Sequence, residues 1–303
     1  MRKGEPAGSA EGVAIFRAIE SARPAGDRLF HDPYAREFLT AGARAVVALS
    51  RVPLLGSTLL AAVDQIAYGQ RAFVLARTVL IDEALEAALA RGAEQVVVLG
   101  AGYDSRAYRI PGIERARVFE VDHPDTQARK RTLLERVVAR IPGHVSFVSI
   151  DFNRQRLSDR MREAGFREGS RCFVIWEGVT EYLDADAVDA TLRYLARSTA
   201  PGSEVVFTYL DLALLDGRRR FRGGRLHLAL IRWAGEPFTF GIDPRNLSSY
   251  LAERGFEQLD DAAGEPLDRR YFGARARRDR SNEYQRVALA RIPANGSAHR
   301  EGR

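Results

Sequence analysis

The sequence predicts an α/β fold built on a doubly wound, mostly parallel sheet. Three observations predict it. Short apolar runs bounded by glycine or polar residues alternate with helical segments. The first run ends directly in a glycine-rich turn, and an aspartate ends the second. We expect a helical cap over residues 1–92, a core over 93–293 and a tail over 294–303.

The N-terminal 92 residues carry the helical part of this expectation. A first short helix should end before Pro24, because a proline disfavours the helical conformation of the residue before it. Asp32-Pro33 is a helix-start signal that predicts a helix over residues 34–39. From 57 to 91 apolar residues recur three and four apart, and Gly69 is the expected break in this stretch.

Apolar runs predict the strands of the core, because strands buried on both faces of a parallel sheet are nearly continuous in Val, Ile and Leu. These runs are Val96–Leu99, Arg117–Asp122, Val145–Ile150, Cys172–Trp176 and Glu204–Thr208. A last strand over residues 283–292 is expected on the sheet edge. Helices are expected over 124–140, over 184–200 with Asp184 as the N-cap, and over 247–254. Residues 211–240 fit the alternation poorly, so we expect an insertion there, near the strand ends.

Composition excludes several classes of protein. Of the 303 residues, 46% are hydrophobic and 28% are charged, which excludes wholesale disorder, collagen and coiled coils. Cys172 is the single cysteine, so an intramolecular disulfide and a cysteine zinc cluster are both excluded. We expect Cys172 to be an inert core residue. A reducing, cytoplasmic location fits this cysteine usage.

The net charge and the lengths of the apolar runs indicate which kinds of partner to expect. The 46 basic and 40 acidic residues give a net charge of +6, and only Lys3 and Lys130 are lysines. We expect a basic enzyme rather than a nucleic-acid-binding protein. Residues 1–12 have no apolar region of a signal peptide, and no run approaches the roughly 20 apolar residues of a membrane helix. No membrane partner is therefore expected.

A glycine-rich turn and a following acid predict a nucleoside-containing cofactor. Gly100-Ala101-Gly102 follows the first strand, where the chain must turn tightly and approach a ligand closely. Asp122 comes 20 residues after Gly102 and can accept two hydrogen bonds from a ribose diol. The alternative is a plain turn followed by a surface aspartate.

The residues around the turn favour S-adenosylmethionine over a dinucleotide. The dinucleotide fingerprint needs a third small residue where this chain has Ser105, and Asp104 would repel a pyrophosphate. With lysines only at 3 and 130, the Tyr-Lys pair of short-chain dehydrogenases is absent. S-adenosylmethionine has no phosphate, and Asp104 would face its ammonium group.

Several motifs together resemble the leucine carboxyl methyltransferase-like family. They are Val98-Leu-Gly-Ala-Gly-Tyr-Asp-Ser-Arg-Ala-Tyr108, Phe119-Glu-Val-Asp-His-Pro124, Trp176-Glu-Gly-Val-Thr-Glu-Tyr-Leu183, Asp27-Arg-Leu-Phe-His-Asp-Pro-Tyr34, Ala76-Arg-Thr78, Phe240-Gly-Ile-Asp-Pro244 and Leu251-Ala-Glu-Arg-Gly-Phe256. The resemblance covers about residues 13–290 and implies a Rossmann-like class I methyltransferase core. Members include bacterial S-adenosylmethionine-dependent O-methyltransferases, some of them in polyketide pathways.

The resemblance implies a role for each matching residue. Arg77 would clamp the methionine carboxylate, since a guanidinium fork matches a carboxylate, and Arg17 would help it. Asp122 would hold the ribose and Glu177 would face the amino-acid end of the cofactor. The remaining implied cofactor contacts are Gly100, Ala101, Gly102, Asp104, His123 at the cofactor edge, Asp151 on the adenine amine and Phe152 on the adenine ring. Without the resemblance, Arg77 would be predicted as a surface residue, and Asp151 and Glu177 as helix caps.

The nature of the methyl acceptor depends on residues near the variable region. A carboxylate is ionised at pH 7 and needs no general base, whereas a phenol with a pKa near 10 or an enol would benefit from one. His227 is the candidate base, and Tyr182 lies where it could touch cofactor or substrate. The basic run Arg218–Arg222 could bind a substrate carboxylate, meet an acidic carrier protein, or be solvated surface. The histidines have no metal-ligand spacing, so no metal is expected.

Four functions remain open on the sequence alone. A small-molecule O-methyltransferase of secondary metabolism is favoured. The motifs resemble those of the bacterial members of the family, and the sequence shows no site for the C-terminus of a protein substrate. An RNA-modifying methyltransferase would need a continuous basic face, to which the arginines of 269–286 could contribute. A non-catalytic S-adenosylmethionine-binding protein and a nicotinamide enzyme are the other two. The oligomeric state is open.

Overall fold

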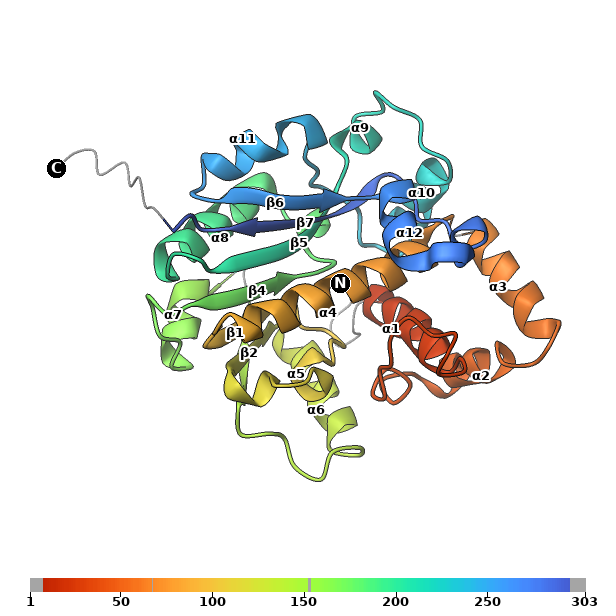
Figure 1. Ribbon diagram of the computed structural model, residues 1–303, viewed down its shortest axis with the longest axis horizontal. Coiled ribbons are helices and arrows are strands. Elements are labelled where there is room, and N and C mark those ends of the chain that lie inside the picture. The colour runs from red at the N-terminus through yellow and green to blue at the C-terminus, as the bar shows by residue number, and fades with distance from the viewer. Residues whose placement is uncertain (1–7, 67, 152–153, 295–303) are drawn as a thin grey trace.

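A seven-stranded sheet forms the centre of the molecule in a computed structural model that describes residues 8–66, 68–151 and 154–294 (Figure 1). The strand order is β3-β2-β1-β4-β5-β7-β6. The strands are β1 (Gln95–Leu99), β2 (Arg117–Asp122), β3 (Val145–Ser149), β4 (Cys172–Trp176), β5 (Glu204–Leu210), β6 (Glu257–Ala262) and β7 (Gln285–Arg291). The first five strands pair in parallel, and β7 is antiparallel to both β5 and β6. The predicted doubly wound, mostly parallel sheet is confirmed.

The C-terminal part of the sheet differs from the prediction in one respect. The last strand, β7, does not lie on the edge: it is inserted between β5 and β6. The edge strand is β6, which the sequence analysis did not identify. Its sequence, Glu-Gln-Leu-Asp-Asp-Ala, has too few apolar residues to give a strand signal, and an edge strand tolerates such charges because one side meets water.

Helices cover both faces of the sheet and its carboxyl end. Those preceding the sheet are α1 (Gly8–Ser21), α2 (Ala41–Leu49), α3 (Leu55–Ile66) and α4 (Gln70–Ala90). Those within the core are α5 (Arg106–Arg109), α6 (Pro124–Leu134), α7 (Leu157–Glu163), α8 (Ala185–Ser198), α9 (Leu212–Leu215), α10 (Gly224–Trp233), α11 (Leu247–Ala252) and α12 (Gly264–Phe272). Short 3-10 helices lie at Ile113–Arg115, Thr180–Tyr182, Pro244–Asn246 and Gly273–Arg277.

Most helix boundaries agree with the sequence signals. The first helix ends before Pro24, and Asp184 caps α8 by accepting the Ala187 N–H at 2.7 Å. The break at Gly69 is also confirmed. Its φ is 71°, and a Cβ there would come within 2.2 Å of the Asn282 backbone nitrogen, so only glycine fits between α3 and α4.

Two helix predictions are wrong. Residues 34–39 form turns: the Glu37 N–H bonds the Tyr34 carbonyl at 2.9 Å and the Leu39 N–H bonds the Arg36 carbonyl at 3.2 Å, so the bonds span three residues and not the four of an α-helix. The helix of this region is α2, which begins after Thr40 as its N-cap. In addition, α6 ends at Leu134, well before residue 140.

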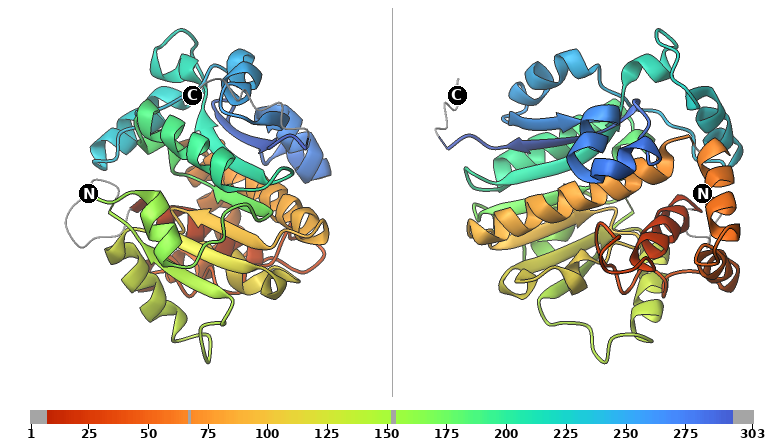
Figure 2. Two further views of the ribbon diagram at one scale, coloured as in Figure 1. Left: turned by 90° about the vertical axis from the view of Figure 1, so that its left-hand side faces the viewer. Right: turned by 45° about the vertical axis from the view of Figure 1, so that its right-hand side comes forward.

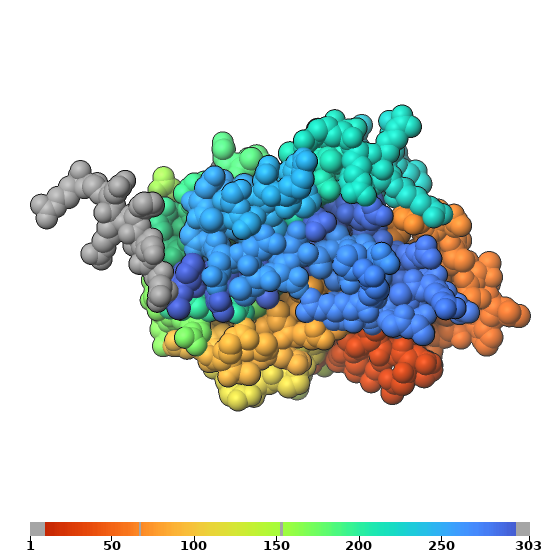
Figure 3. Space-filling view, turned by 45° about the horizontal axis from the view of Figure 1, so that its top comes forward, coloured from red at the N-terminus to blue at the C-terminus, as the bar shows by residue number. Residues whose placement is uncertain are grey.

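Three apolar clusters hold these layers together. One lies between the sheet and the face covered by α8 and α11, and a second lies between the sheet and the face covered by α4 and α12. A third joins α1 and α2 to Tyr103 and to Leu134 of α6. Figures 2 and 3 show the N-terminal helices, red to orange, packed against the core. The division at residue 92 stays a prediction; α4, although N-terminal to it, packs on the sheet.

None of the described helices is both long enough and apolar enough to cross a bilayer.

Candidate active site

The glycine turn after β1 has the backbone that a close ligand approach requires. Gly100 and Gly102 have φ angles of 67° and 38°, a region that residues with a Cβ rarely adopt. A Cβ on Gly100 would lie 2.3 Å from Cγ2 of Val179, which belongs to the loop after β4. The loop after β4 therefore packs against the glycine turn. The positive φ angles require glycine at both positions, and at Gly100 the contact with Val179 requires it as well.

Gly100→Ala should destabilise the protein and weaken cofactor binding, because it adds both a left-handed strain of about 1–2 kcal/mol and a steric clash. Gly92→Ala is the matched control: Gly92 has a φ of 87°, but its Cβ would meet nothing within 4 Å. Urea unfolding should show a larger decrease in the free energy of unfolding for Gly100→Ala than for Gly92→Ala. Equal losses would mean that the contact with Val179 is not restrictive.

Asp122 lies against this turn at the end of β2. Its carboxylate accepts the backbone N–H of Gly102 and, at 2.6 Å, that of His123. Burial raises the pKa of Asp122 above its ordinary value, although the two N–H bonds oppose this. The structure therefore brings together the turn and the acid that the sequence singled out 20 residues apart.

Two further predicted cofactor residues lie beside Asp122 or after the next strand. His123 is the N-cap of α6, with its ring partly exposed and Nδ1 accepting the Asp125 N–H at 3.3 Å. Asp151 follows β3, and the Ile150 N–H before it donates to the Asp122 carbonyl at 2.9 Å. Asp151 is partly exposed and lies 3.6 Å from Nε of Arg154. Phe152 lies outside the described residues.

A cluster of guanidinium and carboxylate groups lies on the other side of the turn. Nε of Arg77 donates to Glu177 at 2.7 Å, and Nη1 of Arg106 donates to the second oxygen of Glu177, also at 2.7 Å. Arg106 Nη1 also lies 2.5 Å from Asp104. Arg77 is only 2% exposed, so its interpretation as a surface residue is wrong. Glu177 is held in ion pairs and caps no helix.

Ion pairing sets the protonation of these acids. Burial alone would raise the pKa of Glu177, but the guanidinium groups of Arg106 and Arg77 outweigh it and hold that pKa below its usual value. Asp104 is also buried, and Arg106 and Lys130 lower its pKa well below the usual range. Both carboxylates are therefore ionised at neutral pH.

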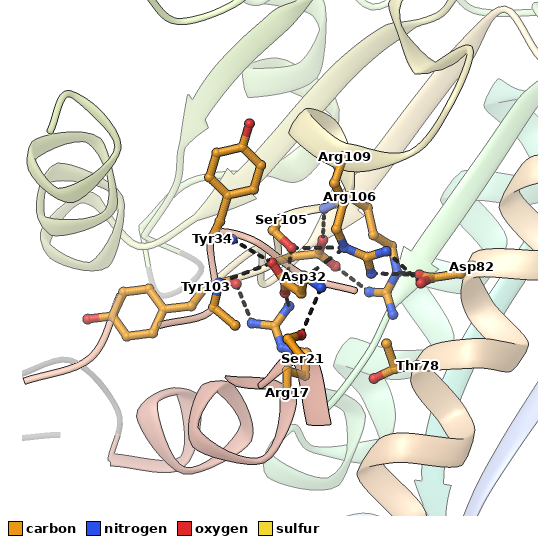
Figure 4. Close-up of polar contacts among 12 residues, drawn as sticks. Arg17, Ser21, Asp32, Tyr34, Thr78, Asp82, Tyr103, Ser105, Arg106 and Arg109 are labelled. Atoms are coloured by element: carbon orange, nitrogen blue, oxygen red, sulfur yellow. Dashed lines mark hydrogen bonds and ion pairs between the residues drawn. The ribbon is translucent and has the colours of Figure 1, made fainter. Parts of the chain in front are cut away.

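A network extends from this cluster into the cap (Figure 4). Arg106 Nε and both terminal nitrogens of Arg109 bind Asp82 of α4 at 2.6–2.8 Å. Asp32 accepts from Ser105 at 2.7 Å and pairs with Arg17 of α1 at 3.0 Å. These contacts connect the turn after β1 with α4 and with the cap.

Arg17 lies at the junction between cap and turn. Besides its pair with Asp32, Nη2 donates to the Tyr103 carbonyl at 2.5 Å. Its predicted contact with a cofactor carboxylate stays a prediction.

Sequence reasoning missed several buried charges around the site. Arg106 stood inside a quoted motif but received no role, although it is 1% exposed and contacts three carboxylates. Lys130 is equally buried, pairs with Glu120 at 2.8 Å and approaches the Ala101 carbonyl at 3.4 Å. The rarity of lysine was the available signal for Lys130.

The two predicted catalytic residues share an aromatic cluster. Tyr182, on the 3-10 helix after β4, lies 5.1 Å from the ring of Phe238, and His227 of α10 meets the same ring edge-on at 5.3 Å. Nδ1 of His227 lies 2.9 Å from the hydroxyl of Tyr284. Thus Tyr182 and His227, 45 positions apart, border one aromatic surface.

His227 should make stability fall as the pH decreases. Burial lowers its pKa to about 4, so between pH 6.5 and 4 the unfolded chain binds more protons than the folded one. We expect the free-energy advantage of wild type over His227→Gln to shrink by up to roughly 3 kcal/mol from pH 7 to pH 4. Urea unfolding of both proteins at both pH values measures this.

Tyr284→Phe is the control for that measurement. It removes the 2.9 Å contact but leaves the His227 ring buried, so the pH dependence due to His227 should persist. If the free-energy advantage of wild type over His227→Gln does not change with pH, the prediction is wrong.

Two other expectations concern Cys172 and metals. Cys172 is buried at the start of β4, and burial raises the pKa of its thiol to about 12, as an inert core residue requires. Among the residues that the structure describes, no group of three or more His, Cys, Asp or Glu side chains could hold a metal ion.

Comparison with known proteins assigns the chain to a family. The profile of the leucine carboxyl methyltransferase family matches residues 10–196. A Streptomyces coelicolor relative is 34% identical over 256 residues, covering 82% of each chain. A Mycolicibacterium smegmatis relative is 30% identical over 285 residues, covering 88% of this chain and 93% of the relative. A Bacillus subtilis relative is 29% identical over 202 residues, 66% of each. All three are named as S-adenosyl-L-methionine-dependent methyltransferases.

Solved structures agree at the level of the fold. A methyltransferase structure from Thermobifida fusca has a TM-score of 0.56 at 15% identity and covers 97% of both chains. A structure from Streptomyces avermitilis has a TM-score of 0.54 at 16% identity and covers 96% of this chain and 99% of its own. Together with the profile match, these comparisons show that the chain belongs to the leucine carboxyl methyltransferase family of S-adenosylmethionine-dependent methyltransferases.

Proposed function

We propose that this protein is an O-methyltransferase that transfers the methyl group of S-adenosylmethionine to the carboxylate of a small molecule. The observation that carries the proposal is the arrangement of Arg77, Glu177 and Asp122 around the glycine turn. It offers groups of opposite charge to the amino-acid end of the cofactor and a carboxylate to its ribose. The sulfonium of S-adenosylmethionine supplies a methyl group already activated for in-line transfer.

The side chains present fit the amino-acid end of this cofactor. Arg77 uses only Nε toward Glu177, so among the described residues its two terminal nitrogens have no hydrogen-bond partner. Nη2 of Arg106 is buried and likewise lacks a partner within the described chain. Guanidinium nitrogens in this state favour a carboxylate ligand. Glu177 and Asp104, both ionised, are suited to face an ammonium group.

The other cofactor contacts follow from the strand ends. We propose that Gly100, Ala101 and Gly102 line the methionine part, and that Asp122 holds the ribose with His123 at its edge. Asp151 and Phe152 would contact the adenine after β3. Arg17 would act beside Arg77, from its position between Asp32 and the Tyr103 carbonyl.

The state of His227 favours a carboxylate acceptor over a phenol or an enol. With its pKa lowered to about 4, His227 is neutral at pH 7 but a weak base, and Nδ1 already contacts Tyr284. A carboxylate acceptor needs no proton removed, whereas a phenol needs a stronger base. Rate then depends on positioning, to which Tyr182 and the aromatic ring of Phe238 would contribute. The cap would exclude water from the site.

Calorimetric titration with S-adenosylmethionine, S-adenosylhomocysteine and NAD tests the cofactor first. We expect both adenosyl compounds to bind and NAD not to bind. If neither adenosyl compound binds, the proposal is overturned. A panel of apolar carboxylic acids and phenols then tests the acceptor. Methylation of carboxylic acids that persists in His227→Gln is expected; methylation of phenols alone, abolished by that change, would assign His227 as a base.

Two alternatives make different predictions. An RNA-modifying enzyme would bind RNA with an affinity that falls steeply with salt. Several arginines of 269–286 are instead engaged by carboxylates of this chain: Arg269 with Glu265, Arg270 with Asp260, Arg275 with Glu20 and Asp279, and Arg286 with Asp261. A non-catalytic binding protein would bind S-adenosylmethionine but methylate no acceptor.

The biological setting is part of the proposal. The family resemblance supports a role in secondary metabolism of the polyketide type, in the cytoplasm, with an acceptor either free or attached to a carrier protein. In the basic run before α10, Arg218 pairs with Asp216 and Arg219 with Glu283, which leaves the neighbouring arginines to meet such an acceptor.

A further inference from the structure

An apolar surface remains exposed at one edge of the molecule, on α3 with the residue before it and on α10. We call it the apolar edge and define it by Leu54, Leu55, Ile66, Leu226, Leu230 and Trp233. Their exposed fractions range from 39% for Leu230 to 88% for Trp233. Single exposed apolar residues are ordinary, but several on two adjoining helices favour an interaction surface.

The two helices are neighbours in space. In the right-hand view of Figure 2, α3 and α10 lie along the same edge of the molecule, and in Figure 3 the orange segment of α3 forms the right-hand end. Arg222, just before α10, lies 4.4 Å from the ring centroid of Tyr68, just after α3. A Cβ on Gly223 would come within 2.5 Å of Cβ of Tyr68, so the chains approach closely.

The orientation of α10 is the reverse of that of an ordinary surface helix. Leu226, Ala229, Leu230 and Trp233 have the spacing of one apolar stripe, which normally faces a core. All four are exposed. The opposite side of the helix carries His227, which contacts Phe238 and Tyr284. The inner side of α10 therefore borders the aromatic cluster of the candidate site, and its apolar stripe faces outward.

Positive charge surrounds this surface. Residues 217–235 contain six arginines and no Asp or Glu, and residues 41–66 contain two arginines and one acid, Asp64, which pairs with Arg71 at 2.6 Å. Arg225 and Arg232 of α10 are exposed beside the apolar stripe. A partner for this edge must therefore offer an apolar interior and negative charge around it.

We propose that the apolar edge docks on an anionic lipid surface. Leu, Ile and Trp flanked by arginines form the pattern of helices that lie in a membrane interface, with the apolar face among the acyl chains and the guanidinium groups at anionic headgroups. Docking of this kind needs no spanning helix. The expectation of no membrane partner rested on the lack of a signal-peptide region and of a spanning segment, and neither bears on docking at a surface. The inference goes beyond the proposed function and does not depend on it.

Tryptophan fluorescence tests the proposal on the full chain. The chain has two tryptophans; Trp176 is 2% exposed and Trp233 is 88% exposed, so a change in emission reports Trp233. Vesicles of phosphatidylcholine with phosphatidylglycerol should shift the emission to the blue and co-sediment the protein. Vesicles of phosphatidylcholine alone should do both much less.

A matched pair of variants separates docking from general attraction. Leu230 and Leu259 are 39% and 40% exposed, but only Leu230 belongs to the apolar edge. Leu230→Gln should weaken vesicle binding about tenfold, and Leu259→Gln should leave it unchanged. Arg225→Gln with Arg232→Gln should remove the preference for anionic vesicles.

Four outcomes would overturn the proposal. The first is no binding to either type of vesicle. The second is equal binding by Leu230→Gln and Leu259→Gln, which would mean attraction by arginines alone. The third is an emission shift that follows protein concentration without vesicles, which would assign the edge to a second copy of the chain. The fourth is an emission shift that an acidic amphipathic peptide causes and vesicles do not, which would assign the edge to a protein partner.

Discussion

Replacing Arg106 by methionine should cost at least about 3–5 kcal/mol of folding free energy and abolish cofactor binding. Arg106 is 1% exposed and contacts Asp82, Asp104 and Glu177, so its removal leaves buried carboxylates without their cation. Methionine keeps most of the volume, which separates the loss of charge from the loss of packing. Urea unfolding and calorimetry measure the two effects.

The pH dependence of this variant provides a sharper check. Glu177 and Asp104 have lowered pKa values in the folded protein, so the stability they contribute is present at neutral pH and is lost on acidification through those values. The deficit of Arg106→Met should therefore be largest near pH 7 and should shrink as the pH falls.

Arg167→Met is the matched control for Arg106→Met. Arg167 pairs with Glu94, but both side chains are at least half exposed. Its loss should cost less than about 1 kcal/mol. A similar cost for both variants would refute the assigned role of Arg106.

Asp122→Asn should weaken binding of S-adenosylmethionine by about 100-fold or more. A carboxylate accepts two hydrogen bonds from a ribose diol, and each bond to a charged acceptor is worth roughly 1.5–3 kcal/mol. Asparagine keeps the shape but only one acceptor oxygen, so one of the N–H groups of Gly102 and His123 loses its acceptor, and urea unfolding must show that the variant is folded. Titration calorimetry measures the affinity directly, and the rise in melting temperature with added cofactor should diminish in parallel.

Asp125→Asn is the natural comparison for this change. Asp125 lies in the first turn of α6, close in sequence, but its side chain is 54% exposed. Its affinity for the cofactor should match that of wild type. Should Asp122→Asn also bind normally, the ribose would have to lie elsewhere, although the methyltransferase assignment would stand.

The parts of the fold that were predictable are those whose sequence pattern is set by burial. β1 and β4 are buried at every residue, and both appear as uninterrupted apolar runs. The edge strand β6 has no such pattern, because it is paired on one side only and most of its residues are only partly buried. The helix predicted for residues 34–39 is wrong because Asp32 and Pro33 are signals shared by helix starts and turns, and the backbone bonds that follow span three residues.

The candidate site divides in the same way. Asp122 was predicted from its place after the second strand and Glu177 from the family resemblance, and both lie where parallel strands bring their carboxyl ends to one edge. The contacts of Asp32 with Arg17 and Ser105 depend on how the cap sits on the core, for which the sequence has no local signal. The outward direction of the α10 stripe was unpredictable for a related reason: periodicity identifies an apolar face but not what covers it.

The position of β7 constrains the order in which the sheet can be completed during translation. β7 pairs with β5 on one side and β6 on the other, and both are synthesised before it. Until residues 285–291 have left the ribosome, β5 has an open edge and β6 has no strand to pair with. Open edges recruit other chains. A nascent chain that stops before Gln285 is thus exposed to aggregation and to proteolysis, and the synthesis of β7 removes that exposure.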